Sequence, residues 1–247
     1  MMLRKWETLP KNMQTEEVRK YYDILKKKSF ALFFKRLFDI FVSLIMLILL
    51  SPVFLVLAVA IKVDSKGPVF YRQERVTQYG EKFKIFKFRT MVSDADKVGT
   101  HVTVKNDSRI TRVGSFIRKF RLDEISQLID VLRGTMTFVA PRPEAVKYVE
   151  HYTPEMMASL LLPAGVTSLA SIYYKDEAEL LDGAEDADKV YVEEILPGKM
   201  YYYLREIEKF SFWADIATMF KTVFAVLGKE YKGDYVPKGQ AESEVKQ

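Results

Sequence analysis

One apolar segment, Leu37 to Ile61, constrains this chain more than any other feature of its sequence. Between Arg36 and Lys62 it carries a single acidic residue, Asp39, close to its start. As a helix rising about 1.5 Å per residue, the segment is long enough to cross the hydrocarbon core of a bilayer with some tilt. No second apolar run approaches this length, so the sequence does not predict a polytopic membrane protein.

Two features of the segment disfavour a simple span. Pro52 lacks a backbone donor and clashes with the preceding turn, so a kink is expected at Ser51-Pro52, where the Ser51 hydroxyl can bond a freed carbonyl. Basic residues flank both ends, and the positive-inside rule places both ends on the cytoplasmic side. The pattern favours a re-entrant helix that enters and leaves by one face; a transmembrane anchor with a tolerated proline is the alternative. The flanking cations are Lys26, Lys27, Lys28, Lys35 and Arg36 before, and Lys62, Lys66, Arg72 and Arg75 after.

Charge is distributed unevenly along the chain. Residues 1–147 contain 28 Lys/Arg against 15 Asp/Glu, whereas residues 148–247 contain 10 against 18. A basic half beside a membrane segment indicates anionic headgroups or phosphate-bearing substrates. Nucleic acid is not expected as a partner, because no binding motif accompanies the charge.

Several kinds of chemistry are disfavoured by what the chain lacks. Without cysteine it has no disulfide or thiolate chemistry. The two histidines, His101 and His151, have no metal-ligand spacing, so a histidine metal site or a Ser-His triad is not supported. The apolar segment is not predicted to be a secretory signal, because it starts far from the N-terminus and no small-residue cleavage site follows it.

The remaining sequence predicts a mostly helical α+β fold, with a cytosolic catalytic body, a small β-hairpin and surface amphipathic helices. Residues 69–76 and 82–91 form the hairpin around Tyr79-Gly80. Two short helices follow in Ile110 to Gly134, with Gly134 as the C-cap of the second. We expect four regions: a 1–34 amphipathic extension, a 35–62 re-entrant helix, a 63–228 catalytic domain and a 229–247 flexible charged tail.

Three further segments carry expectations. The N-terminal helix suits a membrane surface and packing on the body about equally well. Asp94 to Ser108 is polar and predicts a loop. Met200 to Leu227 predicts one long amphipathic helix, whose apolar stripe can pack on the body, lie on the membrane or form a homodimer seam; packing is the commonest of these. The stripe comprises Leu204, Ile207, Phe210, Trp213, Ile216, Phe220, Val223 and Leu227.

The candidate chemistry lies at Arg118-Lys-Phe-Arg-Leu-Asp-Glu124. Acidic residues in a first helical turn favour the helix dipole, and on these residues alone that plain explanation is the commoner one. The functional explanation is a carboxylate nucleophile, a second carboxylate that binds a metal or handles a proton, and arginines that bind phosphate.

A series of motifs resembles the bacterial sugar transferase family, the monotopic phosphoglycosyl transferases that start glycoconjugate assembly on a polyprenyl phosphate. The resemblance extends from Lys35 to about Gly228. The motifs, in the family's order, are Lys35-Arg-Leu-Phe-Asp39, Ser51-Pro52, Gly67-Pro-Val-Phe-Tyr-Arg-Gln-Glu-Arg75, Lys87-Phe-Arg-Thr-Met91, Asp107-Ser-Arg-Ile-Thr-Arg-Val-Gly114, Leu122-Asp-Glu-Ile-Ser-Gln-Leu128 and Ala140-Pro-Arg-Pro-Glu144.

The resemblance implies an enzyme that moves a sugar 1-phosphate from a UDP-sugar to a polyprenyl (undecaprenyl) phosphate, with the sugar and the polyprenol left open. Asp123 matches the nucleophile, which forms a covalent phosphosugar-aspartyl intermediate and releases UMP, and Glu124 matches its partner. Mg²⁺ is the implied cofactor, bound at Asp123 and Glu124. Arg118 and Arg142 are implied phosphate ligands. The implied location is the cytoplasmic face of the bacterial inner membrane, in contact with lipid, and the implied pathway is exopolysaccharide or another glycan.

Lys87 and Arg89 are also assigned to phosphate binding, with a supporting role for both as the alternative. Two segments depart from the family pattern. Thr135 stands where an acidic residue is common, and Ala140 replaces a glycine. Pro163 to Ser168 departs where the family has Pro-Gly-Ile-Thr-Gly, so the sugar can differ from that of the best-known members.

Two other classes of function remain open. A non-catalytic membrane scaffold gives no reason for the motif series. A metal-dependent phosphodiesterase would use water as the acceptor, and would not require polyprenyl phosphate.

Overall fold

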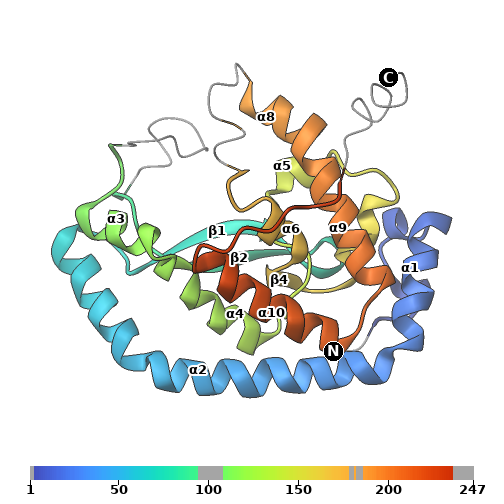
Figure 1. Cartoon of the computed structure of the whole chain (residues 1–247), viewed down its shortest axis with the longest axis horizontal. Coiled ribbons are helices and arrows are strands. Elements are labelled where there is room, and N and C mark those ends of the chain that lie inside the picture. Colours follow the sequence, from blue (N-terminus) through green and yellow to red (C-terminus); the bar gives the residue numbers. More distant parts are fainter. Residues whose placement is uncertain (1–2, 94–107, 178–180, 182–185, 236–247) are drawn as a thin grey trace.

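The computed structural model describes residues 3–93, 108–177, 181 and 186–235. A long bent helix, α2 (Ser29–Asp64), runs along one edge of the molecule, and the remaining elements pack on one side of it (Figure 1). The fold is mostly helical with two small sheets, as the sequence predicts. Most of the predicted loop at Asp94 to Ser108 and the tail beyond residue 235 lie outside the described residues.

The kink predicted at Ser51-Pro52 is confirmed. The two halves of α2, Ser29–Leu49 and Ser51–Asp64, meet at 61°. The Ser51 hydroxyl donates to the Ile48 carbonyl at 2.7 Å, which supplies a hydrogen bond where proline cannot. In the described part of the chain no single straight helix is long and apolar enough to cross a membrane, whereas the two halves together meet the length and composition requirement.

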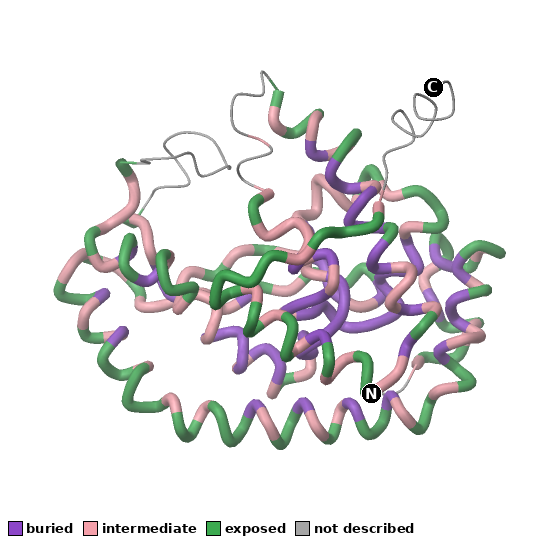
Figure 2. Tube along the Cα trace, in the orientation of Figure 1, coloured by how far each residue is buried: buried purple, intermediate pink, exposed green. Residues whose placement is uncertain are grey.

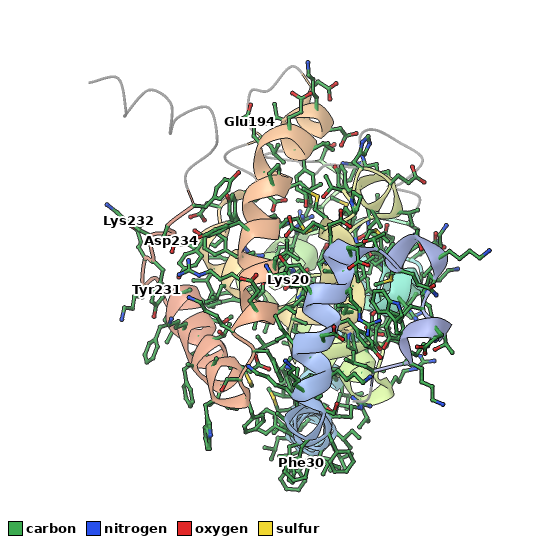
Figure 3. The ribbon with its side chains drawn as sticks, turned by 90° about the vertical axis from the view of Figure 1, so that its right-hand side faces the viewer. Lys20, Phe30, Glu194, Tyr231, Lys232 and Asp234 are labelled. Atoms are coloured by element: carbon green, nitrogen blue, oxygen red, sulfur yellow. The ribbon has the colours of Figure 1, made fainter. Side chains whose placement is uncertain are left out.

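Helix α2 exposes apolar residues and buries polar ones, which is the reverse of the pattern of a helix that faces water. Its outward residues are large and apolar, for example Leu49, 70% exposed, and Val63, 83% exposed. Figure 2 shows exposed positions along the outer side of the helix, and in Figure 3 Phe30 projects away from the body. Polar residues at a spacing of four, Lys35, Asp39 and Ser43, are buried against the body.

These inward polar residues attach α2 to the core. The Lys35 ammonium donates to the Val139 carbonyl at 2.8 Å and pairs with Asp215 at 2.5 Å. Asp39 accepts a hydrogen bond from the Thr137 hydroxyl at 2.7 Å. Arg36 donates to the last carbonyls of the short helix α4 (Leu128–Arg133). The first half of α2 is therefore held by buried hydrogen bonds, which cost stability if left unmade.

The predicted hairpin is confirmed as β1 (Phe70–Val76) and β2 (Lys82–Phe88), paired antiparallel with Arg75 opposite Phe83 and Tyr71 opposite Lys87. A second sheet was not predicted. It pairs β3 (Met136–Val139) with β4 (Ala164–Thr167) in parallel, at the centre of the core. Its strands have four residues each, too short for a periodic pattern to reveal them.

The single helix predicted over Met200 to Leu227 is wrong. The structure has two helices, α9 (Leu196–Glu208) and α10 (Phe212–Val226), with Ser211 extended between them. The predicted stripe divides accordingly: Ile207 and Phe210 are buried, whereas Trp213, Phe220 and Leu227 are exposed. Residue Phe212 stacks edge-on with Phe38, so α10 lies against the first half of α2.

The N-terminal segment packs on the body. Helix α1 (Glu16–Lys27) follows two 3₁₀ turns, η1 (Trp6–Thr8) and η2 (Lys11–Met13), and buries Val18, Tyr22 and Leu25. The Tyr21 hydroxyl donates to Glu155, and Lys20 pairs with Glu208 of α9. Of the two fates open to this helix, the described residues therefore favour packing on the body over lying free on a membrane.

The remaining elements are short and connect these parts. The part of the C-terminal tail that the structure describes, 229–235, has no helix or strand, yet the Tyr235 amide donates to the Tyr202 hydroxyl at 2.8 Å. The remaining elements are η3 (Gln78–Gly80), α3 (Arg112–Lys119), η5 (Leu122–Gln127), α5 (Val146–Val149), η6 (Met156–Leu161), α6 (Leu169–Tyr173), α8 (Ala187–Val190) and the π-helical turn η7 (Tyr191–Ile195).

Candidate active site

The candidate carboxylates lie on a sharp turn between α3 and η5. Arg121 has φ 55°, a left-handed conformation that is uncommon for a non-glycine residue. It reverses the chain so that Asp123 and Glu124 open a 3₁₀ turn, rather than the first turn of an α-helix as the sequence predicts. The turn is fixed to the hairpin, because the Ser126 hydroxyl donates to the Phe86 carbonyl at 3.0 Å. The predicted C-cap at Gly134 is confirmed, with φ 90°.

Glu124 is held by two cations. The Arg142 guanidinium makes a two-pronged contact with it, Nη2–Oε1 at 2.7 Å and Nη1–Oε2 at 3.2 Å, and Lys87 Nζ lies 3.5 Å from Oε1. Burial opposes the charge on Glu124, but Arg142 and Lys87 outweigh it and hold the pKa of this carboxyl far below its usual value. These contacts favour the ionised form of Glu124, and both of its oxygens accept from Arg142.

Asp123 differs from Glu124 in its ion pairing and in the direction of its pKa shift. Among the described residues no cation lies within 4.0 Å of its carboxylate. Burial, and then the neighbouring charge of Glu124, raise the pKa of Asp123, while Lys87 and Arg118 oppose the shift. Adjacent carboxyls whose pKa values are pushed apart can take different roles, a paired organiser and a reactive group.

The structure brings three of the four predicted phosphate-binding cations to this pair. Lys87 and Arg142 contact Glu124, and Arg118, in the last turn of α3, is close enough to influence the charge of Asp123. Arg89 is placed elsewhere. It is buried at the end of α2, where it donates to the carbonyls of Ser65 at 2.7 Å and Lys66 at 2.9 Å. These contacts are those of a C-terminal helix cap, so the alternative of a supporting role fits Arg89 better than phosphate binding.

A second buried cluster is centred on Glu144, two residues after Arg142, and it was not predicted from the sequence. The Glu144 carboxylate accepts hydrogen bonds from Tyr191 at 2.7 Å and Lys199 at 2.8 Å, and Lys199 also lies 3.2 Å from Glu177. The Pro-Arg-Pro-Glu segment is thus held at two residues, because Arg142 binds Glu124 and Glu144 binds Lys199. The Ala140-Pro-Arg-Pro-Glu144 motif pointed to this segment. Nothing in the local sequence identifies Lys199, which lies 55 residues after Glu144 in the chain.

The two departures from the family pattern occupy different places. Thr135 lies in the connection from α4 to β3, where its hydroxyl contacts the Asp130 carbonyl at 3.2 Å and its carbonyl accepts from Thr77 at 2.7 Å. Those contacts are structural. The segment from Pro163 to Ser168 contains β4, and its Val166 carbonyl accepts from Arg142 at 3.2 Å. This second departure therefore contacts a residue of the site.

The residues present can hold Mg²⁺ only if the phosphates of a bound substrate supply further ligands. Within the described residues no group of three or more His, Asp or Glu side chains is placed to hold a metal. Both oxygens of Glu124 accept from Arg142, which leaves Asp123 as the uncommitted carboxylate. Mg²⁺ commonly takes one or two carboxylates and completes its coordination with phosphate oxygens and water, and Asp123 meets that requirement.

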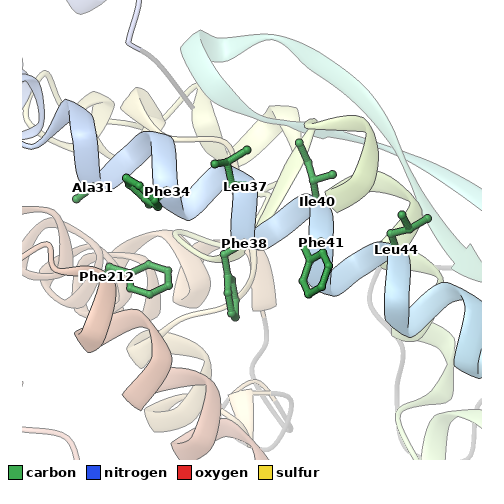
Figure 4. Close-up of a pocket in the computed structure, with 8 residues that line it drawn as sticks. All are labelled: Ala31, Phe34, Leu37, Phe38, Ile40, Phe41, Leu44 and Phe212. Atoms are coloured by element: carbon green, nitrogen blue, oxygen red, sulfur yellow. The ribbon is translucent and has the colours of Figure 1, made fainter.

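An apolar pocket lies between α2 and the start of α10 (Figure 4). None of the site residues lines it. Its lining residues are Ala31, Phe34, Leu37, Phe38, Ile40, Phe41, Leu44 and Phe212.

The chain is similar to known proteins over most of its length. The family described as "Bacterial sugar transferase" matches residues 30–229. A UDP-glucose:undecaprenyl-phosphate glucose-1-phosphate transferase from Klebsiella pneumoniae is 40% identical over 197 residues, 77% of this chain and 39% of that protein. A UDP-N-acetylgalactosamine-undecaprenyl-phosphate N-acetylgalactosaminephosphotransferase from Aeromonas hydrophila is 35% identical over 79% of this chain and 44% of that protein.

A third relative matches a shorter stretch of the chain. A putative undecaprenyl-phosphate N-acetylgalactosaminyl 1-phosphate transferase from Bacillus subtilis is 39% identical over 135 residues, 55% of this chain and 75% of that protein. The chain thus spans about two fifths of the length of the first two curated relatives and most of the length of the third.

Proposed function

This chain belongs to the bacterial sugar transferase family, and from that premise we propose that it transfers a sugar 1-phosphate from a UDP-sugar to undecaprenyl phosphate. The names of its relatives supply the donor and acceptor classes. The observation that carries the proposal is the asymmetric pair of carboxylates: Glu124 is fixed by Arg142, and Asp123 beside it has no cation within ion-pair distance in the described part of the chain.

The proposed reaction has two displacements at one phosphorus. In the first, a carboxylate oxygen of Asp123 bonds to the β-phosphorus of the donor, the bond from that phosphorus to the bridging oxygen breaks, and UMP leaves with the electron pair. In the second, an oxygen of undecaprenyl phosphate bonds to the same phosphorus and the aspartyl carboxylate departs unchanged. The mixed anhydride formed in between preserves the transfer potential of the donor.

The cations around Asp123 have distinct tasks in this scheme. The charges of Lys87 and Arg118 act on Asp123, and these cations offset the charge of the phosphoryl group during transfer. Glu124 holds the Arg142 fork in one orientation, so that the guanidinium requires no rearrangement when substrate binds. Mg²⁺ at Asp123, when bound, would neutralise and orient the diphosphate.

Membrane attachment through α2 supports the lipid acceptor. Its outer surface is apolar over both halves, and its buried polar residues all face the body. We propose that α2 is a re-entrant helix whose two ends lie on the cytoplasmic face of the inner membrane. Leu122 and Ile125, which flank the carboxylates, pack against the cluster that holds Leu57 and Ile61 of α2. In the proposed arrangement the carboxylates are therefore close to the membrane surface, where a soluble donor and a lipid acceptor can reach one site in turn.

The test is UMP release from a panel of UDP-sugars, with and without undecaprenyl phosphate. The proposal expects wild type to form the polyprenyl diphosphate sugar and Asp123→Asn to lose at least 10³-fold in rate, an order of magnitude typical for removing a nucleophile. Sugar phosphate release without a lipid acceptor would instead indicate the phosphodiesterase. Unchanged activity in Asp123→Asn would exclude Asp123 as the nucleophile.

A further inference from the structure

Arg75 is a cation of the site that neither the motif assignments nor the comparisons explain. It lies on β1 opposite Phe83, and Lys87 lies on β2 opposite Tyr71. Residues two and four apart on a strand share a face, and paired residues point to the same side. Arg75, Tyr71 and Lys87 therefore share one face of the hairpin, the face that presents Lys87 to Glu124.

Within the part of the chain that the structure describes, Arg75 has no carboxylate partner. Its guanidinium donates to the Gln73 amide oxygen at 2.8 Å, and no described Asp or Glu lies within 4.0 Å of it. The pKa of Arg75 is lowered by burial, which the attraction of Glu144 only partly offsets. Taking a guanidinium out of water without pairing it costs free energy.

The neighbouring carboxylates are already committed. Glu144 accepts from Lys199 and Tyr191, and Glu124 accepts from Arg142 and contacts Lys87. An anion that enters the site would therefore meet, in Arg75, a guanidinium that no carboxylate of the described residues binds. A phosphate matches the forked geometry of such a group.

The position of Arg75 relative to Asp123 indicates which phosphate of the donor it binds. Asp123 adjoins Glu124, which Arg142 and Lys87 contact, whereas the amide of Val76, next to Arg75, donates to the Glu144 carbonyl at 3.0 Å. Arg75 therefore lies beside the Pro-Arg-Pro-Glu segment, and the contacts that connect it to Asp123 run through Arg142 and Lys87. In an in-line displacement the attacking and leaving oxygens lie on opposite sides of the phosphorus, so the leaving group faces away from Asp123.

We propose that Arg75 binds the α-phosphate of the donor and stabilises it as the leaving nucleoside monophosphate. The inference rests on the proposed function. As the bond between the β-phosphorus and the bridging oxygen breaks, that oxygen gains the electron pair and its negative charge, and the Arg75 N–H groups donate to the α-phosphate that carries it. No proton is transferred.

The experiment compares the binding of UMP and of uridine to the full chain by titration calorimetry, in wild type and in Arg75→Gln. Loss of a hydrogen bond to a charged group corresponds to about 10- to 100-fold in affinity, and this weakening is expected for UMP alone. The KM for the donor should rise, while the KM for undecaprenyl phosphate in the second step should stay the same. Arg72→Gln is the matched control, because Arg72 lies on the same strand with its side chain on the opposite, exposed face.

A folded Arg75→Gln that binds UMP within twofold of wild type overturns the proposal. Equal weakening of UMP and uridine also overturns it, because that result signals a general distortion of the site. If the glutamine variant does not fold, Arg75→Lys is the deciding variant, because it keeps the positive charge and loses the forked donor geometry. UMP should bind to it at least threefold more weakly than to wild type. Unchanged affinity overturns the proposal. Failure of wild type to release UMP from any UDP-sugar is a separate result, which removes the proposed function itself.

Discussion

The Glu124 carboxylate and the Arg142 guanidinium form a two-pronged ion pair, with contacts of 2.7 and 3.2 Å. The pair fixes the orientation of Arg142 and leaves neighbouring Asp123 as the uncommitted carboxylate. In our account this division of roles is what makes the site a transferase.

Replacing Arg142 by Lys should lower the transfer rate by about 10- to 100-fold, because a lysine keeps the charge but cannot make both contacts. Steady-state kinetics at saturating donor measures the effect. Arg133→Lys, an exposed change in α4, is the control. A rate within twofold of wild type for Arg142→Lys would mean that the fork has no part in catalysis.

The first step should lose rate as the pH falls, because Asp123 must be ionised to attack. Burial and the Glu124 charge raise the pKa of Asp123, so the acid limb should lie above the pH at which an ordinary aspartate titrates. Single-turnover UMP release measured across pH gives the limb directly. A limb at or below the ordinary value would show that Asp123 is not the titrating group.

Glu206→Gln should stabilise the protein near neutral pH. Burial raises the pKa of Glu206 to about 8, and its Oε2 atom has no hydrogen-bond partner. A carboxyl whose folded pKa is raised binds its proton more tightly in the folded state, so wild type loses stability as the pH rises from the unfolded value to about 8.

Glutamine removes that loss, so the gain should be absent below pH 4.5 and reach about 1 to 3 kcal/mol by pH 8. Denaturant unfolding at several pH values measures it. The exposed Glu194→Gln is the control, and a gain for Glu206→Gln that does not vary with pH would contradict the argument.

Arg89→Met should lower stability by about 2 to 4 kcal/mol, because it leaves the carbonyls at the end of α2 without their donor. Thermal unfolding in detergent or nanodiscs reports the change. If melting is unaffected while the KM for the donor rises, Arg89 binds phosphate after all, as first predicted from its motif.

The topology of α2 can be tested with single cysteines, since the sequence of 247 residues contains none. In sealed vesicles, Lys27→Cys and Lys66→Cys should react with a membrane-impermeant maleimide from the same side. Labelling from opposite sides would establish the transmembrane anchor and exclude the re-entrant helix.

Features with a local cause could be read from the sequence, and those made by distant partners could not. Pro52 and Gly134 act on their own turns, so the kink and the helix end were both predictable. The break between α9 and α10 was missed, because no Gly or Pro marks the residues from Lys209 to Ser211.

The same contrast holds at the site. Asp123, Glu124 and Arg142 stand in recognisable motifs. Lys199 reaches Glu144 only through the packing of α9. Arg89 stands two residues from Lys87 in one motif, yet β2 ends between them at Phe88, and Arg89 turns to the end of α2.

The most direct test of the central claim is intact mass spectrometry of the protein mixed with Mg²⁺ and a panel of UDP-sugars, without undecaprenyl phosphate. Our account predicts that wild type retains the mass of one phosphosugar with the correct donor, and that Asp123→Asn retains none. Absence of any adduct on wild type, together with UMP release only when undecaprenyl phosphate is present, would show direct displacement and contradict the account.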